Sequence, residues 1–220
     1  MFKPNLTSEL LTYGVKETLK DININSFLEL GSGSGYVTLN TFKNINTDDI
    51  KIVATDVMPK AKGVAETNFL NSKINVEFRV GNLLEPIKKN ETFDIIVSDV
   101  ASISQKLNKY LPWYDGVPCN TGDDGLSLFN EIISNISKHL NEKSCFVYPV
   151  LSLCDTDKLS ENINKVFNKN ISLIQKKWPL KVENIHLKNC LDTLKSKRYI
   201  NFEVKSGFYV FSTEIRASYF

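Results

Sequence analysis

The segment that most constrains the fold of this chain is 27–35, which reads FLELGSGSG. A short apolar run contains Glu29 near its end, and glycine then occupies every second position from Gly31 to Gly35. Apolar runs of this length are typical of strands buried on both faces, and glycines let a backbone turn tightly and approach a ligand without a Cβ in the way. The segment predicts a strand, a loop and a helix that build a nucleotide site. The alternative is a plain glycine and serine turn between two core elements.

The glycine spacing distinguishes between classes of nucleotide. A dinucleotide loop reads G-x-G-x-x-G and holds a pyrophosphate, but here Tyr36 occupies the position of its third glycine. No Gly-Lys-Ser or Gly-Lys-Thr follows, so a Walker-type phosphate loop is excluded. Glu29 would repel a phosphate, yet its carboxylate could accept hydrogen bonds from an ammonium group. S-adenosylmethionine fits this pattern, because it carries an ammonium, a sulfonium and an adenosine but no phosphate.

A second acid follows the next apolar run. Asp56 ends the run 50–56, about twenty residues after the glycines, which is the offset at which an acid holds a ribose diol. Val57 or Met58 would then pack on the adenine face. The alternative for Asp56 is a solvated loop aspartate.

Composition limits the possible classes of protein. The chain has 220 residues, 42% of them hydrophobic, and a net charge of +2, which suits one α/β domain over 1–220. A local excess of basic residues between 176 and 205 is more typical of a solvated face than of a nucleic-acid groove, so a nucleic-acid partner is not expected.

No apolar run is long enough to span a bilayer and no secretory segment is evident, so a cytoplasmic protein without membrane association is expected. The four cysteines lack C-x-x-C spacing, which predicts neither a metal site nor a disulfide framework; Cys145 and Cys154 are predicted to be core thiols.

Alternating patterns predict a doubly wound α/β fold whose mostly parallel sheet has seven strands. Strands are expected at 26–30, 50–55, 74–80, 92–98 and 144–151, and helices at 7–19, 36–42, 59–71, 125–140 and 157–167, the first capped by Thr7 or Ser8. The tail departs from this alternation, with a run at 171–180, a short helix at 184–194 and two alternating runs at 199–204 and 207–216. The last two runs predict a hairpin that closes the sheet with an antiparallel C-terminal strand. The domain therefore has a helical N-terminal segment (about 1–22) and a C-terminal insertion (about 181–206).

A family resemblance covers nearly the whole chain. The order E-L-G-S-G-S-G, A-T-D-V, G-N-L-L-E-P and F-D-I-I-V-S-D-V-A resembles the class I S-adenosylmethionine-dependent methyltransferases. Within that class the chain is most similar to the release-factor glutamine N-methyltransferases (HemK-like). The segment from Phe2 to Leu11 is similar to the F-x-P-x-x-x-T-E-L-L segment before their first strand, and 122–129 is similar to the segment that opens the helix after their catalytic loop.

The resemblance implies roles for individual residues in binding S-adenosylmethionine. The carboxylate of Glu29 and the glycine-loop backbone would hold the methionine part of the cofactor, Asp56 would hold the ribose, and Asn82 and Leu83 would lie at the adenine. Asn82 stands where the family usually has an aspartate, and a turn-forming asparagine is the alternative for it. The full set of expected cofactor-binding residues is Glu29, Gly31, Ser32, Gly33, Gly35, Asp56, Val57, Asn82, Leu83 and Asp99.

The chain departs from the family at 99–102, which reads DVAS instead of N-P-P-Y. The family motif binds a planar amide or amine through its asparagine and its aromatic ring, so a protein glutamine is not expected as the acceptor here. The chain also has only about twenty-five residues before the first strand, too few for the N-terminal helical domain with which those enzymes dock their protein partner. A small-molecule or peptide acceptor is expected instead.

Asp99 is the predicted catalytic residue. It follows a strand next to the cofactor strand, where a carboxylate could orient an amine or accept its proton. The alternative is a loop aspartate that caps the next turn. Aromatic side chains follow in the chain, and the expected substrate-binding residues are Tyr110, Trp113, Tyr114 and Asp115. Ordinary packing is the alternative for each, and it is the commoner role of such side chains. Trp178 and the basic segment 181–205 could form a second wall.

In-line displacement is the expected mechanism, because a sulfonium is an activated leaving group and needs neither a metal nor a covalent intermediate. Three alternatives stay open. The chain could use S-adenosylmethionine as its own substrate in a cyclase or lyase reaction that releases methylthioadenosine, it could be a non-catalytic binding module for S-adenosylmethionine, or it could be a nicotinamide oxidoreductase. The glycine spacing disfavours the last of these.

Overall fold

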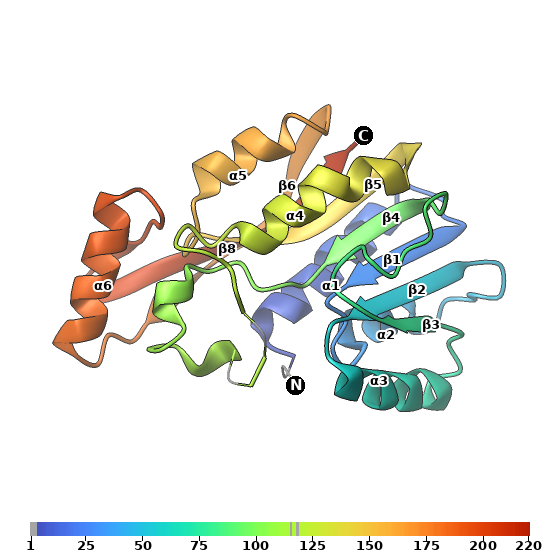
Figure 1. Cartoon of the computed structure of the whole chain (residues 1–220), viewed down its shortest axis with the longest axis horizontal. Coiled ribbons are helices and arrows are strands. Elements are labelled where there is room, and N and C mark those ends of the chain that lie inside the picture. Colours follow the sequence, from blue (N-terminus) through green and yellow to red (C-terminus); the bar gives the residue numbers. More distant parts are fainter. Residues whose placement is uncertain (1–3, 115, 118) are drawn as a thin grey trace.

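A twisted sheet forms the middle layer of the structure (Figure 1). The computed structural model describes residues 4–114, 116–117 and 119–220, and within these residues the sheet has eight strands. The strands are β1 (Ser26–Leu30), β2 (Lys51–Asp56), β3 (Glu77–Val80), β4 (Phe93–Ser98), β5 (Leu140–Leu151), β6 (Lys169–Leu180), β7 (Glu203–Lys205) and β8 (Phe208–Tyr219). Their order is β3-β2-β1-β4-β5-β8-β6, and β7 pairs with β8. Strands β1 to β5 are parallel and β8 is antiparallel to its neighbours, which confirms the predicted fold class and adds one short strand to the seven expected.

Helices cover both faces of this sheet. They are α1 (Leu6–Leu19), α2 (Tyr36–Phe42), α3 (Pro59–Asn71), α4 (Ser127–Ile136), α5 (Thr156–Ile163) and α6 (Ile185–Ser196). Neighbouring strand residues point to opposite faces, so Phe27 packs among side chains of α1 and α2, whereas Leu28 packs among side chains of α4 and α5. Both faces are therefore buried, which explains why the parallel strands read as nearly continuous apolar runs.

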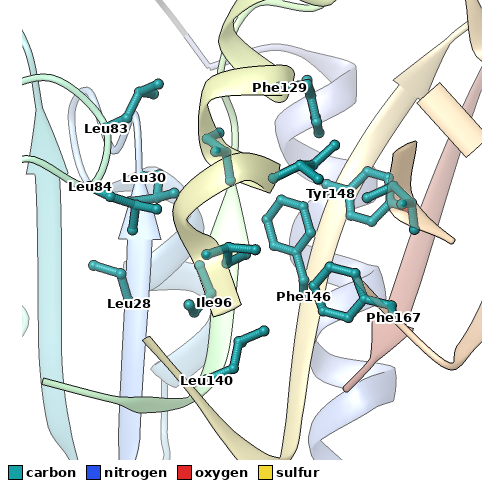
Figure 2. Close-up of a cluster of buried hydrophobic side chains, with 14 of the residues drawn as sticks. Leu28, Leu30, Leu83, Leu84, Ile96, Phe129, Leu140, Phe146, Tyr148 and Phe167 are labelled. Atoms are coloured by element: carbon teal, nitrogen blue, oxygen red, sulfur yellow. The ribbon is translucent and has the colours of Figure 1, made fainter. Parts of the chain in front are cut away.

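Aromatic rings fill the layer between α4 and the sheet (Figure 2). The rings of Phe146 and Tyr148 are stacked with their centroids 4.7 Å apart, and the ring of Phe129 on α4 lies 5.6 Å from that of Tyr148 in an edge-on arrangement. Phe167 stacks on Phe146 at 6.0 Å. Aromatic pairs at these separations stabilise the core beyond the area they bury. This packing holds α4 rigidly over the sheet, beside the carboxyl ends of the central strands.

Several predicted boundaries were wrong by a few residues. The cap of α1 is Asn5, not Thr7 or Ser8, because the Asn5 side chain accepts hydrogen bonds from the backbone N–H groups of both residues. The helix expected at 125–140 ends at Ile136 and continues only as one 3₁₀ turn, because Leu140 already pairs with Phe93 in the sheet. The helix expected at 157–167 is shorter, and the strand expected at 74–80 begins only at Glu77.

The C-terminal part forms the predicted hairpin and a further helix. Ser206 and Gly207 both have positive φ, 48° and 80°, which is the backbone of a tight turn between antiparallel strands. Helix α6 is capped by Asn184 and buries Leu187 and Leu191 in a separate apolar cluster that includes Phe211 of β8. The segment 181–206 thus packs at the C-terminal end of β6 and the N-terminal end of β8 (Figure 1). None of the helices in the described part of the chain is long and apolar enough to cross a membrane.

Candidate active site

The glycine loop after β1 is tied to the neighbouring strand by its backbone. The N–H groups of Gly31 and Ser32 both donate to the carbonyl oxygen of Thr55 on β2, each at 2.9 Å. The loop lies at the carboxyl ends of β1 and β4, where the sheet order reverses direction, and ligands of open α/β sheets bind at this place.

Two of the loop glycines are required by close packing and one borders open space. All three have positive φ: 74° at Gly31, 54° at Gly33 and 79° at Gly35. A Cβ at Gly35 would lie 2.5 Å from the ring of Phe69, and one at Gly31 would lie 2.9 Å from Val100 Cγ1. A Cβ at Gly33 would meet nothing within 4 Å. The backbone of Gly33 is therefore the part of the loop that a ligand can approach directly.

Glu29 lies beneath this loop rather than in the open space above it. Its side chain is buried, and its Oε2 accepts hydrogen bonds from the backbone N–H of Thr38 at 3.1 Å, from the Thr38 hydroxyl and from Ser32 Oγ at 3.3 Å. Burial raises the pKa of Glu29 to about 8; the Thr38 bonds oppose this shift and the nearby Asp99 adds to it. A cation bound above the loop would favour the ionised form of this carboxyl group.

Asp56 supports the other side of the same loop. Its Oδ2 accepts from the backbone N–H of Gly33 and its Oδ1 from that of Met58, both at 2.8 Å. The carboxylate is thereby held at the end of β2, with Val57 and Met58 beside it in the lining of the cavity described below.

Asn82 and Leu83 follow β3 and meet α4 across the cavity. The carbonyl oxygen of Leu83 accepts from Thr55 Oγ1 at 3.1 Å, and Leu83 has a positive φ of 46°. The Asn82 amide donates through Nδ2 to Glu131 Oε1 at 2.6 Å. Glu131 thus brings a carboxylate from α4 to the position at which the sequence analysis expected only an amide.

These residues surround a cavity of about 400 Å³ at the carboxyl ends of the strands. The expected cofactor residues in its lining are Gly31, Ser32, Gly33, Asp56, Val57, Asn82, Leu83 and Asp99. The lining contains three carboxylates, Asp56, Asp99 and Glu131, and within the described residues no lysine, arginine or histidine. This charge suits a cationic nucleoside without phosphates, and the open space beside Gly33 gives it room, so the residues present fit S-adenosylmethionine.

Asp99 is held by the N-terminal helix. Its backbone N–H donates to the Leu30 carbonyl oxygen at 3.1 Å, and its Oδ2 accepts from Ser8 Oγ on α1 at 2.7 Å. Although the carboxylate borders the cavity, protein surrounds it closely, and this burial raises its pKa to about 6 against the opposing effect of the Ser8 bond. A carboxyl group with such a pKa can accept a proton near neutral pH.

A second cavity of about 210 Å³ adjoins the first. Asp99, Val100 and Tyr114 line both cavities, so the two meet at the end of β4. Trp113 lines the second cavity, as does Trp178 of β6. Tyr110 packs in the apolar cluster beneath α6 and is not among the residues that line either cavity. Asp115 lies outside the described residues.

The structure thus gathers most of the expected site residues around two adjoining cavities and leaves some outside them. Glu29 and Gly35 are placed in the supporting layer, where they shape the loop from below. Sequence reasoning missed Ser8 and Glu131. Ser8 lies in the N-terminal segment that resembles the family, and this resemblance is a signal for a site residue. Nothing in the pattern of α4 singles out Glu131.

Comparison with known proteins identifies the domain that carries this site. Residues 27–111 match a family described as "Methyltransferase domain". Over these residues the chain is part of a class I S-adenosylmethionine-dependent methyltransferase domain. The matched stretch runs from β1 to the loop after β4 and so includes the glycine loop, Asp56, Asn82 and Asp99.

The methyltransferase domain has curated relatives among proteins named release factor glutamine methyltransferase. It is 33% identical over 95 residues to the one from Flavobacterium psychrophilum, covering 42% of this chain and 33% of the relative. It is 30% identical over 145 residues to the one from Dictyoglomus turgidum, covering 61% of this chain and 50% of the relative. The chain thus spans a third to a half of the length of these two relatives.

Solved structures share the fold of this chain over almost its whole length. A precorrin-6y methyltransferase from Geobacter metallireducens has a TM-score of 0.58 at 13% identity, with 94% of this chain and 86% of that chain covered. A methyltransferase from Pyrococcus furiosus has a TM-score of 0.52 at 18% identity, with 94% and 82% covered. At such identities the likeness concerns the fold alone.

Proposed function

We propose that the chain is a methyltransferase that moves the methyl group of S-adenosylmethionine to a nucleophile on a small molecule or peptide by in-line displacement. The observation that carries the proposal is the contact between the two cavities at Asp99, Val100 and Tyr114. A cofactor in the larger cavity and an acceptor in the smaller one would face each other across these three residues. A second cavity at this place favours transfer to a separate acceptor over a reaction of the cofactor alone.

The larger cavity supplies contacts for each part of the cofactor. The Gly33 backbone would border the methionine part, and Asp99 would face its cationic groups. Glu29, buried beneath the loop with a raised pKa, would ionise as the cation binds. Asp56, already oriented by the N–H groups of Gly33 and Met58, would accept from the ribose hydroxyls. Asn82 and Glu131 would receive the adenine edge.

The reaction requires two things of the protein, which are the placement of the nucleophile and the acceptance of one proton. When bound, the sulfonium supplies a methyl group on an activated leaving group. The chain would hold the nucleophile in line with that group, and Val100 and Tyr114, which line both cavities, would restrict the access of water there. Asp99, oriented by Ser8, would accept the proton that the nucleophile loses.

A substitution at Asp99 tests the proposal. Asp99→Asn should lower turnover by about 10²-fold or more, the usual contribution of a positioned acid or base, and leave cofactor affinity within a few-fold of the wild type. Asp48→Asn is the matched control, because Asp48 is an exposed loop aspartate before β2. Methyl transfer is followed by mass spectrometry and cofactor affinity by calorimetry.

The same incubations separate the alternatives. Release of methylthioadenosine from protein and cofactor alone would identify a cyclase or lyase, and binding without conversion of any acceptor would identify a binding module. Full turnover in Asp99→Asn would remove Asp99 from the chemistry.

A further inference from the structure

The floor of the second cavity is one face of the C-terminal half of the sheet. Pro149 and Leu151 of β5, Phe211 and Thr213 of β8, and Trp178 of β6 all line it. Within β5 and β8 the lining residues are two positions apart, and the register pairs Leu151 with Thr213 and Trp178 with Phe211, so these side chains share a face. These strands lie after residue 111, beyond the stretch that matches the family. The cavity is therefore shaped by the part of the chain that the family match does not cover.

Aromatic and apolar side chains make up much of the walls of this cavity. The ring of Trp113 lies 5.5 Å from that of Phe211, and Leu6 of α1 and Val100 of the loop after β4 also line it. The lining further includes the polar residues Asn5, Thr7, Ser102 and Thr213. The chain has two tryptophans, Trp113 and Trp178, and both line this cavity. Such walls favour a flat apolar body.

Charge restricts the occupant further. Asp99 is the one acidic side chain among the described lining residues, and none of them is a lysine, arginine or histidine. Burial raises the pKa of the Tyr114 phenol far above its usual value, so that hydroxyl stays neutral. A buried carboxylate without a basic partner repels anions, whereas a carboxylate beside aromatic faces attracts an ammonium group.

The size of the cavity limits the occupant to one ring-bearing group. Its volume is about 210 Å³. About seven molecules of liquid water occupy this volume. At the packing density of a protein interior, the cavity holds a body of about ten non-hydrogen atoms.

We infer that the methyl acceptor is a primary or secondary amine on a flat apolar body of about ten non-hydrogen atoms, with its nitrogen on Asp99 and its body between Trp113, Trp178 and Phe211. This inference rests on the proposed methyltransferase function and specifies its acceptor. The amine binds as an ammonium ion and gives one proton to the Asp99 carboxylate. The nitrogen lone pair then forms the new N–C bond as the bond from the methyl carbon to sulfur breaks, and that electron pair stays on sulfur. The proton on Asp99 passes to water, so charge and atoms balance.

Tryptophan fluorescence tests binding without any need for turnover, since every tryptophan of the chain lies in this cavity. The probes are phenethylamine, its alcohol analogue phenethyl alcohol and its acid analogue 3-phenylpropanoate, each titrated into the full chain. Phenethylamine should change the fluorescence saturably and bind about tenfold more tightly than the alcohol, and the acid should not bind. Asp99→Asn should abolish the preference for the amine, whereas Asp48→Asn should keep it.

A second pair of variants tests the aromatic wall. Trp178→Leu should weaken phenethylamine binding by about tenfold, read from the fluorescence of Trp113. Phe208→Leu is its control, because Phe208 lies at the hairpin with 65% of its surface exposed. A mass gain of one methyl group on phenethylamine, with S-adenosylmethionine present, completes the expected result.

The outcomes separate the inference from the function on which it rests. Binding of the acid or the alcohol as tightly as the amine would overturn the inference, as would methylation of a glutamine-containing peptide by a protein that binds no amine. Selective binding of phenethylamine without its methylation, with S-adenosylmethionine bound, would also overturn the inference, because the amine would then be a ligand and not the acceptor. The proposed function falls separately if S-adenosylmethionine does not bind, or if the protein releases methylthioadenosine from it without any acceptor.

Discussion

The stability of the Glu29→Gln variant relative to the wild type should rise with pH in the ligand-free protein. Glu29 is 1% exposed and lies among hydroxyl and amide donors, with Asp99 as a second carboxyl group nearby. A glutamine side chain has nearly the same shape, and its amide oxygen can still accept the bonds from Thr38 and Ser32. The substitution therefore removes a buried ionisable group and little else.

The magnitude follows from the two pKa values of this group. In the unfolded chain Glu29 titrates near 4.5, whereas in the folded protein burial raises its pKa to about 8. The folded state then binds more protons than the unfolded state between these values, so the free energy of unfolding falls as the pH rises through that window. For these two pKa values, the stability of the wild type relative to Glu29→Gln should fall by roughly 2–3 kcal/mol between pH 6 and pH 9.

Urea denaturation of both proteins at pH 6 and pH 9, without cofactor, measures this difference. Asp94→Asn is the control. Although burial alone would raise the pKa of Asp94, hydrogen bonds from Asn25, Ser26 and Asn141 lower it overall, so its contribution is lost only at acid pH. The difference between Asp94→Asn and the wild type should thus stay constant from pH 6 to pH 9. A constant difference for Glu29→Gln over the same range would refute the reasoning.

Three further predictions concern the larger cavity. Asp56→Ala should weaken S-adenosylmethionine binding by about a hundredfold, because two charge-assisted hydrogen bonds to the ribose are lost; calorimetry that finds unchanged affinity would contradict the assignment. Gly35→Ala should lower the free energy of unfolding by about 2–3 kcal/mol, because the new Cβ would lie 2.5 Å from the ring of Phe69. A Cβ at Gly33 would meet open space, so Gly33→Ala should lower the free energy of unfolding by only about 1 kcal/mol but should weaken cofactor binding. Equal losses of stability in the two alanine variants, measured by urea denaturation, would count against this packing. Glu131→Gln should weaken cofactor binding a few-fold at low salt and less at high salt, since its carboxylate is exposed at the rim of the cavity; an effect independent of salt would exclude an electrostatic role.

Much of the fold could be predicted from local sequence patterns. Strands buried on both faces read as apolar runs, and the runs before Gly31 and Asp56 placed β1 and β2 correctly to within a residue. Element ends were harder, because they depend on tertiary partners. Leu140 leaves the helical pattern to pair with Phe93, and Asn5 rather than Thr7 caps α1, neither of which the local pattern indicates.

The larger cavity was also accessible to sequence reasoning, whereas the smaller one was accessible only in part, through the aromatic side chains expected at the acceptor. The acids and glycines of the larger cavity follow strand ends, and all strand ends of a parallel sheet meet at one edge, so their position in the chain indicates their position in space. Trp178 and Phe211 come from segments far from Asp99 in the chain, and only the antiparallel pairing of β6 with β8 brings them to the same face. Likewise, only the docking of α1 brings Ser8 to Asp99.

By itself the sequence determined a doubly wound α/β fold and a loop for a phosphate-free nucleoside, because strand periodicity, glycine conformation and the spacing of acids are local properties. The tertiary structure alone decided that Glu29 supports the loop from below, that Glu131 accepts from the Asn82 amide, and that Phe211 joins Trp178 in a cavity beside Asp99. Burial, pKa and cavity shape depend on which distant side chains pack together, and the order of residues along the chain does not specify them.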